Sequence, residues 1–240
     1  MHRTAIWLHI TLLLVVFSAA TAGAARHSGA LRMENRLGWT LSPTLSLQGG
    51  VQARLRDNLS EFYYRKFDAG VAYRYSDRLK LPLTLRVEDR IRDFGWLRST
   101  YLLFDPSLVL AEPGDWRIDI RVRLQYLSDE NSLHFLRIQP RLWRDFELAG
   151  IPLGWWVYND IYVRTADVGV GDVTSYHANN FCTGFNLPLG QGSDLNVYYM
   201  LYTGRSTPDS ERGHSHQACL SLGFSFGGGN GHPLPPSVTN

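Results

Sequence analysis

The chain is poor in cysteine and lysine, and beyond its first residues it has no long apolar run. Its 240 residues include two cysteines, Cys182 and Cys219, too few for a fold built on disulfides. Two of its 24 lysines and arginines are lysines, Lys66 and Lys80. This arginine bias has two open explanations: a genome rich in G and C, or a need for planar side chains with several donors. The formal charge of +2 indicates no nucleic-acid partner.

The one long apolar run lies at the N-terminus, where the sequence reads MHRTAIWLHITLLLVVFSAATAGAA. A short basic start, about 13 apolar residues and a stretch of small residues are typical of a secretory signal peptide. The run is short for a membrane anchor, which needs about 20 residues, so we expect cleavage after Ala22 or Ala24. Because no later stretch is apolar over that length, a mature chain in a membrane must cross it as a β-barrel.

Residues 116–127, WRIDIRVRLQYL, show the pattern that dominates the rest of the chain. Every second residue is apolar, and the residues between them are mostly charged. The apolar set is Trp116, Ile118, Ile120, Val122, Leu124 and Tyr126, and the other set is Arg117, Asp119, Arg121, Arg123 and Gln125. A period of two predicts a β-strand with two different faces. Such a strand suits a sheet with one face in water, and it equally suits a membrane barrel.

Similar alternation, interrupted by turn residues, predicts an all-β fold of about ten strands. They are Leu45–Arg56, Phe62–Tyr75, Leu79–Asp93, Ser99–Ala111, Trp116–Leu127, Leu133–Leu148, Leu153–Thr165, Ser175–Leu189, Asp194–Thr203 and His216–Phe226. Tight turns rich in Gly, Pro, Asp and Ser alternate with a set of connections that includes two longer polar loops. This arrangement is typical of an up-and-down antiparallel transmembrane β-barrel with both termini in the periplasm.

Two features indicate which face of the strands contacts lipid: the small residues in the polar set and the spacing of the aromatic residues on the apolar face. The polar set includes Gly50, Gly184 and Ser221, which suit a crowded lumen better than an exposed strand surface. Trp116 and Tyr126 lie ten residues apart on the apolar face. At a rise of ~3.3 Å per residue and a tilt of ~40°, they are about 25 Å apart along the membrane normal, the height of the apolar band of a membrane barrel. We therefore expect the apolar face to contact lipid.

Five segments carry a resemblance to a known family: VQARLR (51–56), GVAYRYSDRLKL (70–81), IRVRLQY (120–126), FLRIQPRL (135–142) and GFNLPLGQGSDLNVYYM (184–200). They resemble strands of the outer-membrane barrels grouped as domain-of-unknown-function family 2490. The resemblance implies a barrel and an outer-membrane location, but no activity and no catalytic residues. The last predicted strand also resembles the C-terminal signal read by the outer-membrane assembly machinery, so this machinery and outer-membrane lipid are the expected partners.

The sequence therefore divides into four parts. They are a signal peptide (1–24), a periplasmic N-terminal segment (25–44), an outer-membrane β-barrel (45–226) and a disordered tail rich in Gly and Pro (227–240). The expected location is the outer membrane of a Gram-negative envelope.

By the same alternation, fourteen basic and six acidic side chains point into the lumen, a formal charge of +8. The candidate site is a basic cluster of Arg54, Arg86, Arg90, Arg117, Arg121, Arg123, Arg137 and Arg141, with the acidic partners Asp68, Glu88, Asp119, Asp145 and Asp160. The other inward charges are Arg56, Lys66, Arg74, Lys80, Arg92, Arg164 and Glu147. This excess could attract small anions, or the side chains could pair with one another and fill the lumen. We favour the second interpretation.

Catalysis would need a nucleophile and a base close together, and the candidates are His214, Ser215, His216 and His177. Three of them belong to one predicted loop, so we expect no catalytic site. Two histidines are too few for a structural metal site, and no phosphate-loop spacing occurs, so no metal or cofactor is expected. Three functions stay open: a structural or interaction protein of the outer membrane, which we favour, a narrow anion-preferring channel, and a rim enzyme acting on lipid.

Overall fold

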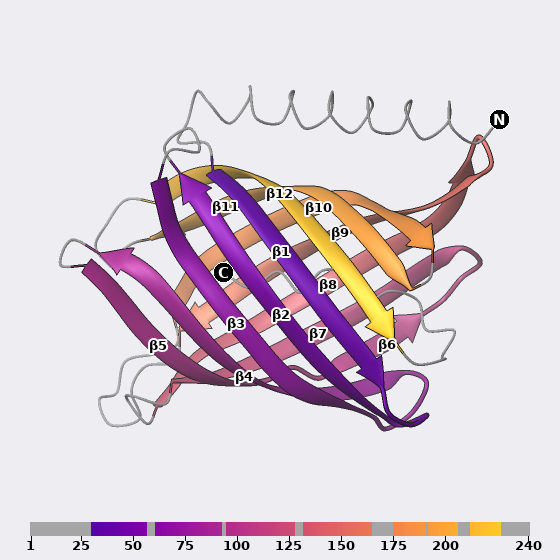
Figure 1. Ribbon diagram of the computed structural model, residues 1–240, viewed down its shortest axis with the longest axis horizontal. Helices are drawn as coiled ribbons and strands as arrows, with labels where there is room; N and C mark the ends of the chain where they lie inside the picture. Colours follow the sequence, from indigo (N-terminus) through magenta and orange to yellow (C-terminus); the bar gives the residue numbers. More distant parts are fainter. Residues whose placement is uncertain are drawn as a thin grey trace.

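The computed structural model describes residues 30–56, 61–92, 95–127, 132–164, 175–190, 192–205 and 212–226. These residues form one sheet that closes on itself as a β-barrel. Its front and back strands run along opposite diagonals (Figure 1). In these ranges no helix is long and apolar enough to cross a membrane. The predicted signal peptide (1–24) and tail (227–240) lie outside the described residues.

The described residues form twelve strands, of which β5 and β6 share one position between β4 and β7, so the barrel has eleven strand positions. The strands are β1 (Ala30–Thr40), β2 (Leu45–Arg56), β3 (Glu61–Arg74), β4 (Leu79–Arg92), β5 (Gly95–Phe104), β6 (Ser107–Ala111), β7 (Trp116–Leu127), β8 (Ser132–Leu148), β9 (Ile151–Arg164), β10 (Ser175–Gly190), β11 (Ser193–Arg205) and β12 (Arg212–Phe226). The prediction of an all-β, up-and-down barrel is confirmed.

The barrel closes where its first strand meets its last. β1 pairs with β12 in parallel, from Ala30 opposite Gln217 to Trp39 opposite Phe226. In Figure 1 the arrowheads of β1 (indigo) and β12 (yellow) point the same way. An odd number of alternating strands brings two strands of the same direction together, so a parallel seam is the only way to close this barrel. Closure leaves no unpaired edge along which a second chain could add.

The first strand changes the predicted boundaries. The sequence pattern predicts an antiparallel barrel of about ten strands that begins at Leu45, with both ends on one side. In the structure the barrel begins at Ala30, and it is mixed because of the seam between β1 and β12. β1 starts at the end with the longer loops and β12 finishes at the end with the short turns. The first and last described residues therefore lie at opposite ends of the barrel.

The short turns fall where the sequence predicts them. They connect β3 to β4, β6 to β7, β8 to β9 and β10 to β11. The turn between β8 and β9 consists of Ala149 and Gly150, both with positive φ (53° and 81°). Positive φ at both residues matches the right-handed twist of the flanking strands, and a two-residue loop is a tight hairpin turn. We refer to this end as the short-turn end.

One predicted strand, Ser99–Ala111, is interrupted in the structure. It breaks at Asp105 and Pro106 into β5 and β6. Pro106 has no N–H to donate to a neighbouring strand, but its carbonyl accepts a bond from Val122 N at 2.9 Å. The Asp105 N–H donates to the Pro82 carbonyl at 3.0 Å, and its side chain is buried. The break thus places a carboxylate on the inner face.

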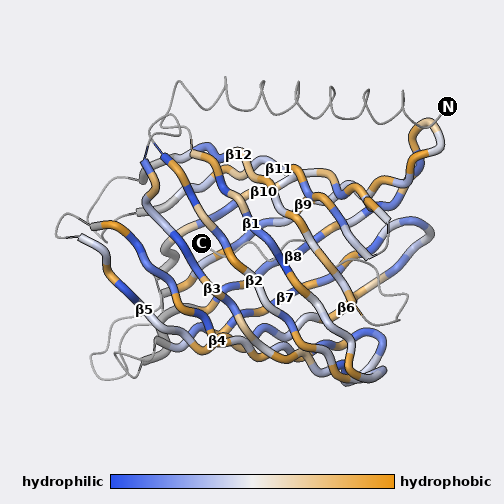
Figure 2. Tube along the Cα trace, viewed as in Figure 1, coloured by the Kyte–Doolittle hydropathy of each residue, from blue (hydrophilic) through white to orange (hydrophobic). Residues whose placement is uncertain are grey.

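The two faces of β7 differ as the alternation predicts. Ile118, Leu124 and Tyr126 are exposed on the outside, whereas Asp119 and Arg123 are each 3% exposed. Figure 2 shows the same alternation of hydrophilic and hydrophobic residues along most strands. The barrel is therefore apolar outside and largely polar inside, the reverse of a water-soluble protein with an apolar core.

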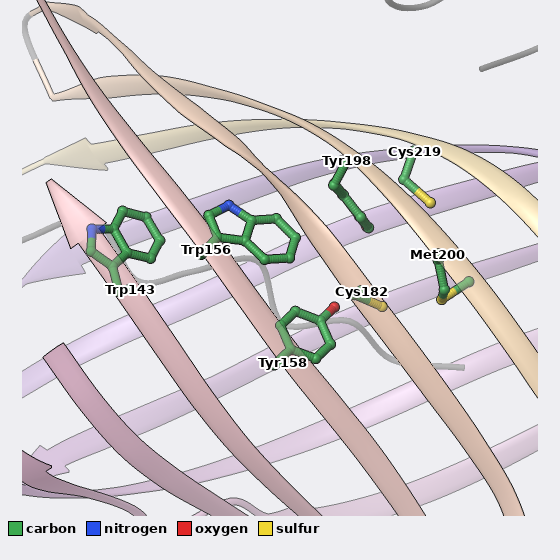
Figure 3. Packing of buried hydrophobic residues seen from close by; sticks show 7 residues of the cluster. All are labelled: Trp143, Trp156, Tyr158, Cys182, Tyr198, Met200 and Cys219. Carbon is green, nitrogen blue, oxygen red and sulfur yellow. The ribbon is translucent and has the colours of Figure 1, made fainter. Parts of the chain in front are cut away.

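The inner wall of β8 to β12 is an exception, because it carries an aromatic and sulfur cluster (Figure 3). Its members are Trp143, Trp156, Tyr158, Cys182, Tyr198, Met200 and Cys219. The Trp156 ring stacks on Tyr158, with centroids 5.2 Å apart and planes at 7°. Both cysteines are buried and free, and β11 lies between the strands that carry them. This side of the lumen is filled by packing and not by charge.

Gly154 provides space for that packing, because a Cβ there would lie 2.5 Å from Cζ2 of Trp143. We expect Gly154→Ala to lower the free energy of unfolding by about 1–3 kcal/mol, since the rigid indole must move. Gly38→Ala is the matched control on the inner face, because its Cβ would meet its nearest atom at 3.7 Å. Urea unfolding in detergent, followed by tryptophan fluorescence, measures both. Equal stability of the two variants would contradict this packing.

Candidate functional site in the barrel interior

The eight arginines of the predicted basic cluster all lie on the inner face. Arg54, Arg86, Arg123, Arg137 and Arg141 are buried, and Arg90, Arg117 and Arg121 are partly exposed. Neighbouring strands lie about 5 Å apart, so these side chains can pair with residues one or two strands away. They do so in four groups.

The first group crosses β1, β3 and β4. Arg32 donates to Glu34 at 2.9 Å. Lys66 Nζ lies 3.8 Å from a Glu34 oxygen and 3.0 Å from Asp68. Arg86 then donates two bonds to the Asp68 carboxylate, at 2.7 and 2.9 Å. Three buried bases are thus held by two carboxylates, and the row extends from the closing seam to β4.

Tyr64 organises the second group, toward the longer loops. Its hydroxyl donates to Glu88 at 2.7 Å. The Arg54 guanidinium lies 4.2 Å from the centre of the Tyr64 ring and the Arg90 guanidinium 5.5 Å from it. Arg90 Nη2 is also 3.6 Å from Glu88. Ring faces attract cations, so one tyrosine and one carboxylate hold two arginines.

Asp105 is the centre of the third group. It accepts two bonds from Arg123, both at 2.6 Å, and one from Arg121 at 2.7 Å. A fork-to-fork pair of this kind fixes both side chains in place. Removing one partner of a buried pair typically costs about 3–5 kcal/mol, because the other charge is left uncompensated. Asp105 therefore has a larger effect on this part of the lumen than either arginine alone.

The fourth group lies on β7, β8 and β9. Asp160 accepts bonds from Arg137 and Gln139, each at 2.7 Å. Asp119 accepts a bond from Arg141 and lies 3.4 Å from Arg117 Nε. The structure thus brings Asp68, Glu88, Asp119 and Asp160 together with the predicted arginines.

The remaining predicted charges lie nearer the rims. Asp145 is exposed at the short-turn end, where it accepts a bond from Trp143 Nε1 at 2.6 Å. Glu147 is exposed at the same end. Arg56 is exposed at the opposite end and pairs with Glu61 at 2.7 Å. The side chains of Arg92 and Arg164 lie outside the described residues.

Three carboxylates that the sequence pattern did not place in the lumen hold some of these bases. Glu34 belongs to β1, whose alternation in LRMENRLGWT is the signal that could have found it. By strand alternation Asp105 falls on the same face as Ser99 and Ser107. It directly precedes a proline inside an otherwise apolar strand, which hides this signal. Asp194 accepts a bond from Arg36 at 3.1 Å and one from Asn186 at 3.0 Å.

The lumen keeps open space at the short-turn end. One cavity of about 240 Å³ is lined by residues of β1 to β8, β11 and β12. A second of about 370 Å³ lies beside the turn at 112–115, and Arg141 lines both. The first cavity reaches the ion pairs of Asp68 with Arg86 and of Asp105 with Arg123, which line it.

Among the described side chains considered for catalysis, Ser215 and His216 do not pair as a nucleophile and base. Neighbouring residues of a strand point to opposite faces, so Ser215 and His216 of β12 lie on different sides of the wall. His216 Nδ1 is hydrogen-bonded to the Tyr199 hydroxyl. His177 and His214 have side chains outside the described residues.

These features define a closed β-barrel with a charged, ion-paired interior. Residues 34–212 match the family model described as protein of unknown function (DUF2490), which is well over half of the chain. The chain therefore belongs to this family. No curated protein matches it.

Replacing Asp105 with Asn tests the third group. Asp105→Asn leaves Arg121 and Arg123 without their carboxylate, so we expect a loss of about 3 kcal/mol in the free energy of unfolding. Asp77→Asn, in the exposed turn between β3 and β4, is the control and should change it by less than about 0.5 kcal/mol. Urea unfolding in detergent measures both. If Asp105→Asn is as stable as the control, the carboxylate does not hold this group together.

Proposed function

We propose that this protein is an outer-membrane β-barrel whose lumen is closed by ion pairs, and that it has a structural or interaction role in that membrane. The observation that carries the proposal is the reversed polarity of the wall. Large apolar side chains such as Phe67, Leu85 and Leu110 are more than half exposed on the outside, while arginines and carboxylates are buried inside. Soluble monomers rarely expose contiguous apolar patches larger than a few hundred Å², so lipid is the solvent that fits this surface.

The outward charges support this placement, because they lie toward the two ends of the barrel. Toward the longer loops, Asp89 pairs with Arg65 and Arg98, at 2.8 and 2.7 Å. Arg65 also lies 5.2 Å from the centre of the Trp96 ring. At the short-turn end, Arg144 lies 5.0 Å from the centre of the Trp116 ring. Aromatic residues mixed with charges at both ends are typical of the interfacial girdles of a membrane barrel.

The closed interior favours a structural or interaction role over an open pore. In the four groups described above, most inward arginines are paired with carboxylates on the same strand or on strands one or two positions away, so few are available to a passing solute. A narrow anion-preferring channel is the second candidate, favoured by the basic residues around the cavity at the short-turn end. The proposed partners are outer-membrane lipid and the machinery that assembles barrels, which would read the outward Leu220, Leu222, Phe224 and Phe226 of β12.

A pair of charge substitutions tests the membrane location. Leu85, in the middle of β4, and Leu110, next to a short turn, are both 52% exposed. In a bilayer, Leu85→Arg should cost about 2–4 kcal/mol and Leu110→Arg about 0–1 kcal/mol, because the penalty depends on depth. We expect Leu85→Arg alone to reduce the folded band in a heat-modifiability gel of the membrane fraction. Equal tolerance of both substitutions would indicate a barrel that folds in water.

Conductance separates the closed barrel from the channel. In a planar bilayer we expect little or no current from the purified protein, and any current should favour anions because the lumen has excess positive charge. Joint replacement of Arg117, Arg121 and Arg123 with Ser should enlarge the current and weaken that preference. A large, steady and unselective current from the unmodified protein would contradict the closed barrel.

A further inference from the structure

Two lumen-lining bases differ from the others in their partners. Arg74 of β3 and Lys80 of β4 both line the 240 Å³ cavity. Within the described residues, neither side chain has a hydrogen-bond or ion-pair partner. The two residues are directly opposite each other in the pairing of β3 with β4. Arg74 is exposed and Lys80 is half-buried, so the pair stands at the mouth of the cavity, where two like charges on facing strand positions repel each other.

The positions beyond this pair leave space. Moving inward along β3 and β4, the next inward pair is Ala72 with Pro82, and the one after it is Gly70 with Thr84. Ala72, Pro82 and Thr84 line the cavity, whereas Gly70 packs closely against β4. The Thr84 hydroxyl already accepts a bond from Gln48 Nε2 at 2.7 Å. The two cations therefore stand at the edge of a hollow and not against a packed wall.

Small and hydroxyl residues continue around the same hollow. Ser46 of β2 is opposite Ala72, and Gly38 of β1 is opposite both Gln48 of β2 and Ser225 of β12. All of these residues line the cavity. Hydroxyl and amide groups can donate to an anion without adding charge, so the wall beside the cations, on β2, β1 and β12, is suited to a polar ligand.

The charges around the cavity favour an anion. Seven basic and four acidic side chains line it, a formal surplus of +3. Lys80 is within electrostatic reach of three arginines, Arg74, Arg117 and Arg141, and of one carboxylate, Asp119. Asp119 is already shared by Arg117 and Arg141. No carboxylate is thus left for the pair formed by Arg74 and Lys80 among the described residues that line this cavity.

We propose that Arg74 and Lys80 form a binding site for a phosphate group at the short-turn end of the lumen. The Arg74 fork can donate to two phosphate oxygens, and Lys80 adds a point charge. The cavity is below the size of sites for drug-like ligands, which start at about 300 Å³. It therefore suits inorganic phosphate or a small phosphate monoester. A doubly charged anion between the two cations also removes their repulsion. This inference goes beyond the proposed function and does not depend on where the barrel is located.

Titration calorimetry of the folded full-length protein in detergent tests the site, with inorganic phosphate, glycerol 3-phosphate and glycerol as probes. We expect both phosphates to bind and glycerol not to bind. Tighter binding of glycerol 3-phosphate assigns the site to an esterified phosphate, and equal binding assigns it to the free ion. Removing a charge-assisted bond weakens binding about ten-fold or more, so Arg74→Gln and Lys80→Gln should each show that loss.

Arg78→Gln is the matched control, because Arg78 lies in the turn that joins the same two strands and does not line the cavity. It should bind phosphate as the unmodified protein does. Without phosphate, Arg74→Gln should be at least as stable as the unmodified protein, since the repulsion is gone, which separates lost binding from lost folding. The proposal is overturned if neither phosphate binds at millimolar concentration, if Arg78→Gln weakens binding as much as Arg74→Gln, or if Arg74→Gln is destabilised without phosphate.

Discussion

Neutralisation of arginine across neighbouring strands is the constraint on which the interior depends. Strand alternation sends every second side chain into a narrow lumen, and in this chain many of those side chains are arginines. Each must find a carboxylate or an aromatic face within reach of one or two strands. Asp68, Asp105 and Asp160 meet this need with bonds of 2.6–2.9 Å. The inner surface therefore behaves as one connected polar network along β1 to β9.

The inner wall of β8 to β12 also carries a cluster that is packed without ion pairs. Between β8 and β12 the inner wall is filled by rings and sulfur atoms, and Gly154 and Gly184 leave the room that Trp143 and Tyr198 occupy. Packing within this cluster depends on the fit of the rings and sulfur atoms, so a single added methyl group at Gly154 or Gly184 would meet a neighbouring side chain. The barrel thus combines two ways of filling a lumen, one on each side.

The sequence predicted the fold well because period-two alternation is local information. The faces of residues 116–127 and the short turns were readable from the residues themselves. The strand Ala30–Thr40 carries the same alternation, although the predicted barrel begins only at Leu45. The sequence did not predict which carboxylate pairs with which arginine, because this pairing depends on the register between neighbouring strands. A break such as the one at Asp105 changes that register, and the unmatched pair of Arg74 and Lys80 appears only once β3 and β4 are aligned.

The parallel seam has a consequence for how the barrel forms. All other neighbouring strands are close in the sequence, separated by at most ten residues or by one short strand, whereas β1 and β12 come from the two ends of the described chain. Closing so long a loop costs roughly 3 kcal/mol more entropy than closing a hairpin, since each doubling of length adds about 0.6 kcal/mol. That cost is small compared with the stabilisation from the pairing of Ala30 to Trp39 with β12. This pairing can form only after β12 has been synthesised. Closure of the barrel therefore depends on residues from both ends of the described chain.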